Sequence, residues 1–386
     1  MPRRFQTSRN KGGFRSWHCG KSPNSAPLTP GTWTYAVSGH RHREKDFEDR
    51  PGTHQFGSPE WEYGEHYAKR EAHAIVRRAL ELGVTLFDTA EIYGIEANPL
   101  ALRALVEGVA LTDITRNSGF GHGEQILGQA LGENRGSAFV ATKFYPTVPV
   151  AALPEQRAVA SAHRLETPCL DLYQIHQPRH IAPSRKIMHG VRALQQAGLV
   201  SEVGVSNASL DRWRAAEQAL RNRVLSNQVG YSLITRSAER DLLPYAESHG
   251  RIVIAYRPLE AGLLSGKYDR DNRPSNRARA TSPLFMPENL ERLRDLIATL
   301  REVADVHSVT PAQVALAWVI RHPAVATIPG ASSVEQLESN VAAADIDLAD
   351  DEYYALQRAS DQFRPVPGPG FMSRQIRSLS GASPTE

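Results

Sequence analysis

Several features that would place the chain in a specialised class are scarce or missing in its 386 residues. Two cysteines, Cys19 and Cys169, are too few for a disulfide framework, which favours a reducing cytoplasm. No run of about 18 apolar residues occurs, so no membrane-spanning helix is predicted. No apolar segment stands near the N-terminus, so no secretory signal is predicted. We therefore expect a cytoplasmic protein with no membrane partner.

An excess of one charge is also missing. The chain has 45 Lys and Arg residues against 42 Asp and Glu residues, for a formal net charge of +3. This near balance favours neither nucleic acid nor acidic lipid as a partner. A hydrophobic fraction of 41% is enough for a full core. The length suits one large barrel with extensions or two smaller domains.

Acidic residues are absent from the first 43 positions, which carry eight Lys or Arg residues and many Ser, Pro and Gly. Such a segment buries little apolar surface, so we predict that it is poorly structured. The same composition also fits an organelle transit peptide or a foreign upstream sequence. Residues 31–35 are the exception and predict a short strand. The histidines up to His66 lack regular metal-binding spacing, so no metal site is predicted.

From residue 67 onward, short apolar runs alternate with segments of helical periodicity. The runs predict strands at residues 86–90, 138–144, 170–176, 201–206, 225–231, 252–257 and 325–328. Helices are predicted at residues 71–82, 123–131, 155–165, 184–197, 209–221, 239–248, 288–306, 311–321, 333–344 and 350–362. This alternation indicates parallel strands joined by right-handed crossovers.

The predicted fold class is α/β, a (β/α)8 TIM barrel with residues 31–35 as the eighth strand, first in order. We expect an atypical N-terminal extension and an insertion after strand 2. The alternative is an open Rossmann sheet, which needs a Gly-x-Gly-x-x-Gly motif after its first strand. Residues 119–123 are glycine-rich but follow no strand.

Titratable side chains stand at the ends of three successive predicted strands. Asp88 stands near the end of the first, with Tyr93 five residues later, while Lys143 and His176 stand near the ends of the next two. Taken singly, Lys143 and His176 are more readily explained as a solvated or hydrogen-bonded strand end, and the Asp88 stretch fits an ordinary strand and turn with a capping Asp equally well. Parallel strands lie about 5 Å apart with their C-terminal ends on one face. We therefore expect the four side chains to converge.

The chemistry of this group favours proton transfer to an oxygen. Tyrosine has an ordinary pKa near 10, and a neighbouring Lys143 cation is expected to lower the pKa of Tyr93. Asp88 can pair with Lys143, while His176 can donate to a carbonyl oxygen. Such a site could protonate an oxygen as hydride reaches its carbon, with no metal and no covalent nucleophile.

The sequence resembles the aldo-keto reductase superfamily, in a subgroup that is also similar to potassium-channel β subunits. The resemblance covers residues 67–363. It is carried by Phe87-Asp88-Thr89-Ala90-x-x-Tyr93-Gly94, Ala141-Thr142-Lys143, Leu172-Tyr173-x-Ile175-His176, Gly204-Val205-Ser206-Asn207, Ser226-Asn227-Gln228, Tyr256-Arg257-Pro258-Leu259, Gly262-Leu263-Leu264-Ser265-Gly266-Lys267 and Ile328-Pro329-Gly330-Ala331-Ser332.

The resemblance implies a catalytic tetrad of Asp88, Tyr93, Lys143 and His176, with Tyr93 as the general acid. It places Trp33, Tyr93 and His176 at the substrate. The implied cofactor is NADPH, with NADH left open as the alternative. Its nicotinamide end would be held by Ser206, Asn207, Gln228 and Tyr256, its pyrophosphate by Arg257, Leu259, Gly262, Leu264, Gly266 and Lys267, and its adenosine end by Gly330, Ser332, Gln336 and Asn340.

Three domains are predicted: a poorly structured segment at 1–66, a barrel at 67–363 and a flexible tail at 364–386. Residues 95–119 are an insertion relative to the family pattern, and could be a lid, a surface excursion or a segment that displaces Tyr93. The expected function is NADPH-dependent reduction of a small aldehyde or ketone. An NADPH-binding redox sensor and a catalytically impaired homologue are the alternatives. The sequence indicates no oligomeric state.

Overall fold

The computed structural model describes residues 65–93, 121–146, 149–176, 185–274, 277–280 and 282–367. Within them, seven strands form one sheet in the order β1 to β7, and every neighbouring pair is parallel. The strands are β1 (Leu86–Asp88), β2 (Phe139–Phe144), β3 (Leu170–Ile175), β4 (Val200–Ser206), β5 (Ser226–Gly230), β6 (Ile252–Tyr256) and β7 (Val325–Thr327).

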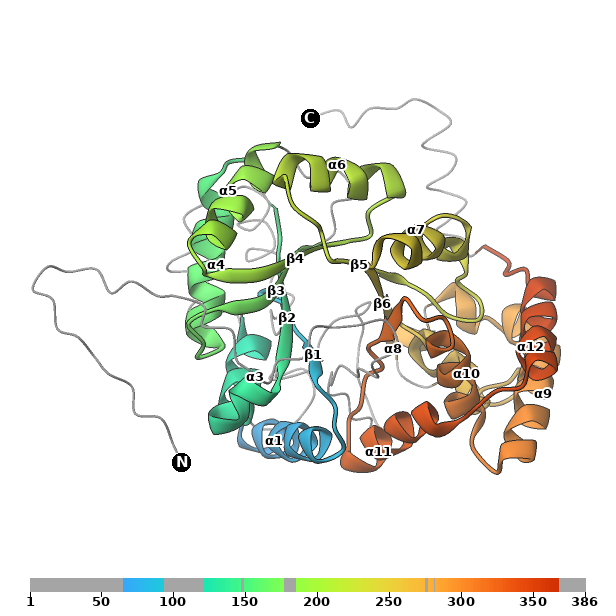
Figure 1. The fold of residues 1–386 in the computed structure, drawn as a ribbon. Coiled ribbons are helices and arrows are strands. Elements are labelled where there is room, and N and C mark those ends of the chain that lie inside the picture. The colour runs from blue at the N-terminus through green and yellow to red at the C-terminus, as the bar shows by residue number, and fades with distance from the viewer. Residues whose placement is uncertain are drawn as a thin grey trace, which may run out of the picture.

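Helices surround the curled sheet on its outer side (Figure 1). They are α1 (Glu65–Glu81), α3 (His122–Leu131), α4 (Ala152–Arg164), α5 (Arg185–Gln196), α6 (Leu210–Leu220), α7 (Leu242–His249), α8 (Arg277–Ala280), α9 (Pro287–His307), α10 (Pro311–Ile320), α11 (Val334–Ala342) and α12 (Asp350–Gln362). All seven strands predicted from residue 67 onward are present, and the architecture is that of a (β/α)8 barrel. The strand predicted at 31–35, the insertion at 95–119 and the tail beyond residue 367 lie outside the described residues.

The strands have an apolar cluster on each face, as alternation of side chains along a strand requires. Leu86 belongs to a small cluster with Leu172 and Ile254, whereas its neighbour Phe87 belongs to a larger one that includes residues of the surrounding helices. The small cluster therefore lies on the inner face of the sheet. Further along this face, polar side chains replace apolar ones and build the candidate site.

A polar layer follows the inner apolar cluster. Gln174 follows Leu172 by two positions on β3, and its Oε1 accepts a hydrogen bond of 3.2 Å from Ser226 Oγ. A side chain at Gly204, on the strand between them, would place its Cβ 2.3 Å from Ser226 Oγ. Glycine at this position therefore lets the two polar side chains meet across the inner face.

Several element boundaries differ from those predicted. β1 ends at Asp88 rather than residue 90, because the chain turns there and Tyr93 N donates to Ala90 O at 3.0 Å. α4 begins at Ala152 rather than residue 155, with Pro154 in its first turn, where a missing N–H costs little. α7 begins at Leu242 rather than residue 239, because a separate 3-10 turn covers the residues before it.

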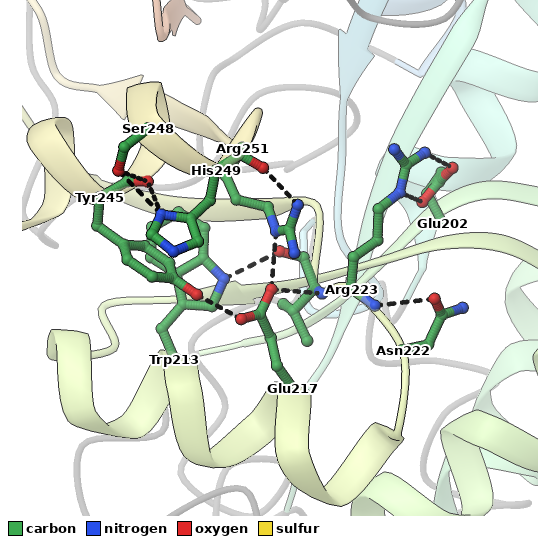
Figure 2. A network of polar contacts seen from close by, with 10 residues as sticks. Glu202, Trp213, Glu217, Asn222, Arg223, Tyr245, Ser248, His249 and Arg251 are labelled. Carbon is green, nitrogen blue, oxygen red and sulfur yellow. Dashed lines mark hydrogen bonds and ion pairs between the residues drawn. The ribbon is translucent and has the colours of Figure 1, made fainter.

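A network at the N-terminal ends of β5 and β6 ties the outer helices to the sheet (Figure 2). Glu217 of α6 is at its centre, and its Oε1 accepts from Arg251 Nε at 2.7 Å and from Val224 N at 3.1 Å. The hydroxyl of Tyr245, on α7, donates to the other oxygen. The network stands at the end of the strands opposite to the candidate site.

Among the described helices, none alone is long and apolar enough to cross a membrane. α9 and α10 reach that length and apolarity only as a pair bent by 92°.

Candidate active site

Lys143 is the centre of the candidate site. It is fully buried near the C-terminal end of β2. Its Nζ donates to Asp88 Oδ2 at 2.6 Å, to Thr89 O at 2.8 Å and to Tyr93 Oη at 3.1 Å. Burial alone would lower the pKa of Lys143, but Asp88 and Tyr93 outweigh it and hold that pKa above its ordinary value. The ammonium is therefore a fixed positive charge beside the Tyr93 hydroxyl, and the predicted Asp88–Lys143 pair is confirmed.

The pKa of Tyr93 is shifted in the direction opposite to the one predicted. Burial raises it above the ordinary value of 10, and the pull of Lys143 in the other direction does not compensate. Asp88 adds to the rise, because its negative charge disfavours a tyrosinate. Tyr93 is thus a protonated hydroxyl at neutral pH, so its proton is available for donation.

His176 follows β3 directly and is only 4% exposed. Its ring stands edge-on to those of Tyr93 and Tyr145, with centroids 6.0 and 6.4 Å away. Burial, assisted by the charge of Lys143, keeps the pKa of His176 well below its ordinary value. The imidazole is therefore neutral, with one N–H to donate. Among the described residues, its Nδ1 has no hydrogen-bond partner.

A series of hydrogen bonds connects Asp88 to residues of β4, β5 and β6 across the inner face. Gln228, on β5, donates from Nε2 to Asp88 Oδ1 at 2.7 Å. The carbonyl oxygen of Gln228 accepts from Ser206 Oγ at 3.0 Å and from Asn207 N at 2.8 Å. Tyr256, at the end of β6, donates to Asn207 Oδ1 at 2.8 Å. The four residues predicted for the nicotinamide end thus form one connected group with Asp88 of the predicted tetrad.

The loop after β6 has an unusual backbone. Glu260, Ala261 and Gly262 follow one another with positive φ angles of 47°, 57° and 90°. Glu260 is buried, and its Oε1 accepts from Ser232 Oγ at 3.0 Å and from Thr235 Oγ1 at 2.5 Å, which fixes the loop to the segment after β5. Closely spaced turns of this kind can direct backbone N–H groups toward an anion.

Of the residues predicted at the pyrophosphate, Arg257 and Lys267 are exposed on this loop. Leu264 is fully buried, so its side chain packs in the core and only its backbone can border a ligand. Gly266 has φ of 72°, and its carbonyl accepts from Arg301 Nη2 at 2.8 Å. The loop therefore combines exposed positive charge with a constrained backbone.

The residues predicted at the adenosine end gather where α11 begins. Ser333 caps the helix by accepting from Gln336 N at 3.3 Å. Gln336 Oε1 in turn accepts from Ser332 N at 2.9 Å and Ser332 Oγ at 2.7 Å, while Asn340 Nδ2 donates to Gly330 O at 3.2 Å. All four predicted residues thus meet around one helix N-terminus. Trp33, predicted at the substrate, lies outside the described residues.

The structure also contains buried carboxylates that the sequence patterns do not reveal. Glu91, two residues before Tyr93, is fully buried, and its Oε1 accepts from Tyr145 N at 2.8 Å. Arg157 Nη1 lies 3.7 Å from its other oxygen. Burial raises the pKa of Glu91 to about 7 although Arg157 opposes the shift. Glu124 of α3 is also fully buried and accepts from Thr142 Oγ1 at 2.5 Å.

No group of three or more His, Cys, Asp or Glu side chains suited to a metal occurs in the part of the chain that the structure describes.

Comparisons with known proteins agree on one family. The sequence pattern of the aldo/keto reductase family matches residues 51–361. Uncharacterized oxidoreductases of Mycobacterium bovis and Mycobacterium tuberculosis are 49% identical over 326 residues, covering 84% of this chain and 93% of each relative. A probable aldo-keto reductase of Glycine max is 27% identical over 292 residues, covering 75% of this chain and 79% of the relative.

Solved structures give the same picture. A glycerol dehydrogenase from Gluconobacter oxydans is 27% identical with a TM-score of 0.65, covering 80% of this chain and 90% of its own. An aldo/keto reductase from Klebsiella pneumoniae, solved with NADP and acetate, is 28% identical with a TM-score of 0.56, covering 81% of this chain and 92% of its own. A structure of an aldo-keto reductase from Klebsiella pneumoniae with NADPH, also 28% identical, has a TM-score of 0.58 and covers 82% of this chain and 91% of its own.

Proposed function

Because the chain belongs to the aldo/keto reductase family, it is an NAD(P)H-dependent oxidoreductase, and we propose that it reduces aldehydes or ketones to alcohols. Tyr93 is the general acid. The observation that carries this proposal is the contact of Lys143 Nζ with both Asp88 Oδ2, at 2.6 Å, and Tyr93 Oη, at 3.1 Å. A buried ammonium in this position favours negative charge on the tyrosine oxygen as the proton leaves.

Each residue around Tyr93 has a separate role in protonating the substrate oxygen. Tyr93 keeps its proton until that oxygen gains negative charge, because burial raises its pKa. Neutral His176, whose ring stands 6.0 Å from that of Tyr93, donates an N–H to the same oxygen and orients it. Asp88 holds Lys143 in its charged state. These roles need no metal ion and no covalent intermediate.

The groups present fit a nicotinamide dinucleotide. Gln228 uses its amide nitrogen on Asp88, which leaves Oε1 to accept from a carboxamide. Asn207 offers a second amide, and Tyr256, half-buried beside it, a ring to stack on nicotinamide. The left-handed loop at Gly262 and the N-terminus of α11 suit phosphate groups. The bound nicotinamide would supply the hydride that adds to the carbonyl carbon.

NADPH is the proposed cofactor. Aldo-keto reductases of Klebsiella pneumoniae, 28% identical to this chain, were solved with NADP and with NADPH. Arg257 and Lys267 add exposed positive charge on the loop after β6, which suits the pyrophosphate of either dinucleotide. NADH is the competing cofactor, and the ratio of the two dissociation constants decides between them.

The test is a fluorescence titration of the purified protein with NADPH, followed by addition of para-nitrobenzaldehyde. We expect binding and then oxidation of NADPH. Tyr93→Phe should keep the dissociation constant for NADPH and lose about 100-fold or more in turnover, because it removes the proton donor. Tyr354→Phe, at an exposed tyrosine of α12, is the matched control and should behave as wild type.

Each other outcome has a distinct meaning. Unchanged turnover in Tyr93→Phe would reject Tyr93 as the acid. Binding without oxidation of NADPH, across a panel of aldehydes and ketones, would instead favour a redox-sensing or catalytically impaired protein.

A further inference from the structure

We propose that Glu91 is a positioning residue that holds the segment after β2 against the turn carrying Tyr93, by accepting the hydrogen bond of the Tyr145 backbone N–H. The proposal rests on the proposed function, since it concerns the geometry around Tyr93. Glu91 touches neither Lys143 Nζ nor the Tyr93 hydroxyl among the contacts that the described residues show. Its effect on the reaction is therefore indirect.

The contacts of Glu91 join three segments of the chain. Its backbone N donates to Lys143 O at 3.1 Å, and its backbone O accepts from Gly121 N at 2.6 Å. Its side chain adds the 2.8 Å bond from Tyr145 N. The turn after β1, the end of β2 and the start of α3 are thus fixed to one another at a single residue.

The segment held by Glu91 contacts a residue of the candidate site. The Tyr145 ring stands edge-on to His176, and the His176 ring stands edge-on to Tyr93. Moving Tyr145 would therefore change the surroundings of His176 directly and those of Tyr93 through His176. A misplacement of about 1 Å in such a site can cost about 100-fold in rate.

The charged and titratable groups that face Glu91 come from three elements. Arg157 of α4 lies 3.7 Å away, and Arg164 of the same helix, Glu124 of α3 and Tyr173 of β3 are electrostatically coupled to it. Burial raises the pKa of Glu91 to about 7, so both protonation states exist near neutral pH. Either state can accept from Tyr145 N, because the carboxyl oxygen accepts whether or not the group is ionised.

The rival explanation is that Glu91 matters as a charge, as the partner of Arg157 in a buried ion pair. Two mild substitutions separate the explanations. Glu91→Gln removes the charge but keeps an oxygen that reaches Tyr145 N. Glu91→Asp keeps the charge but shortens the side chain by one bond, about 1.5 Å, so that the carboxylate no longer reaches that N–H.

The experiment compares wild type, E91Q and E91D in three measurements. These are kcat at saturating substrate, the dissociation constant for NADPH, and hydrogen exchange of a peptide that contains Tyr145, followed by mass spectrometry. We expect E91Q to stay within about 3-fold of wild type in kcat and E91D to lose about 10-fold or more, with NADPH affinity unchanged in both. Exchange of the Tyr145 amide should accelerate only in E91D.

The matched control is Glu124→Gln. It alters the neighbouring buried carboxylate, which contacts the side chains of Thr142 and Arg164 rather than the backbone at Tyr145. We expect it to lower the melting temperature while leaving kcat and Tyr145 exchange as in wild type.

The proposal is overturned if E91D keeps wild-type kcat while E91Q loses it, because the charge would then be what matters. It is equally overturned if both variants change only the melting temperature, which is the signature of a purely structural role. Hydrogen exchange is measured without substrate. Accelerated exchange in E91D with no carbonyl reduction by wild type would therefore reject the proposed function and leave the Glu91 contact established.

Discussion

Gln228 Nε2 donates to Asp88 Oδ1 at 2.7 Å, while the other oxygen of Asp88 accepts from Lys143. The amide predicted to bind nicotinamide is therefore also a partner of the carboxylate that holds the buried lysine. The proposed cofactor contact and the position of the Lys143 charge would thus depend on one side chain, that of Gln228. A change at Gln228 should consequently affect both cofactor affinity and proton transfer.

Replacing Gln228 with Met tests this coupling. The substitution keeps the approximate volume but removes the hydrogen bond to Asp88, and a bond to a charged group contributes about 1.5–3 kcal/mol. We expect kcat to fall about 10-fold or more, together with weaker NADPH binding. Steady-state kinetics and a fluorescence titration measure the two effects separately.

Gln174→Met is the control for this variant, because Gln174 is a buried amide on the same inner face that bonds Ser226. It should lower stability with a smaller effect on kcat. Weakened NADPH binding with unchanged kcat in Gln228→Met would show that Gln228 serves the cofactor alone.

The raised pKa of Glu91 predicts how stability depends on pH. Its pKa is about 7 in the folded protein against an ordinary value of 4.5, so between these values the folded state binds the extra proton. Stability should therefore fall as pH rises from 4.5 to 7 and then level off. The full effect is about 3 kcal/mol, at about 1.4 kcal/mol per pKa unit.

Urea unfolding of wild type and Glu91→Gln at pH 5 and pH 8 isolates this contribution, because the amide does not titrate. Wild type should lose about 2–3 kcal/mol relative to the variant between the two conditions. A difference that does not change with pH would show that Glu91 keeps an ordinary pKa in the folded protein.

The network around Glu217 predicts a stability effect without a kinetic one (Figure 2). Glu217→Gln weakens the contacts with Arg251 and Tyr245 at the end of the strands opposite to Lys143. The carboxylate is only 16% exposed, so we expect a loss of about 2 kcal/mol in the free energy of unfolding, after allowance for solvent screening. Urea denaturation measures this loss, and kcat should stay at the wild-type value.

Arg223→Met supplies the comparison for Glu217→Gln. Arg223 pairs with Glu202 nearby in the same network, but its side chain is 46% exposed. An exposed ion pair contributes about 0–1 kcal/mol, so this variant should change stability much less. A cost as large as that of Glu217→Gln would contradict the distinction between buried and exposed pairs.

Much of this architecture is readable from the sequence, for a physical reason. Parallel strands buried on both sides appear as short apolar runs, and polar residues such as Lys143 stand out where the runs end. All seven strands after residue 67 are recognisable in this way. The predicted ends of helices and strands are wrong where local chemistry overrides periodicity, as at Pro154 inside the first turn of α4.

The carboxylates behind the site are not readable in the same way. Glu91 and Tyr145 are 54 positions apart, and nothing in the periodicity of either segment marks them as partners. The predicted direction of the Tyr93 pKa shift is wrong for a related reason. The sequence shows that Lys143 is near, but the depth of burial that outweighs its charge is a property of the folded chain.

Asn207 contributes a side-chain amide to the candidate site, and its backbone has φ of 54°, in the left-handed region. Few residues other than Gly, Asn and Asp adopt that conformation readily. Glycine would keep the turn and lose the amide, whereas glutamine would keep the amide and strain the turn. Both the backbone conformation and the side-chain amide therefore restrict which residues this position can accept. Among active clones from a library randomised at residue 207, asparagine should occur far more often than its share of codons.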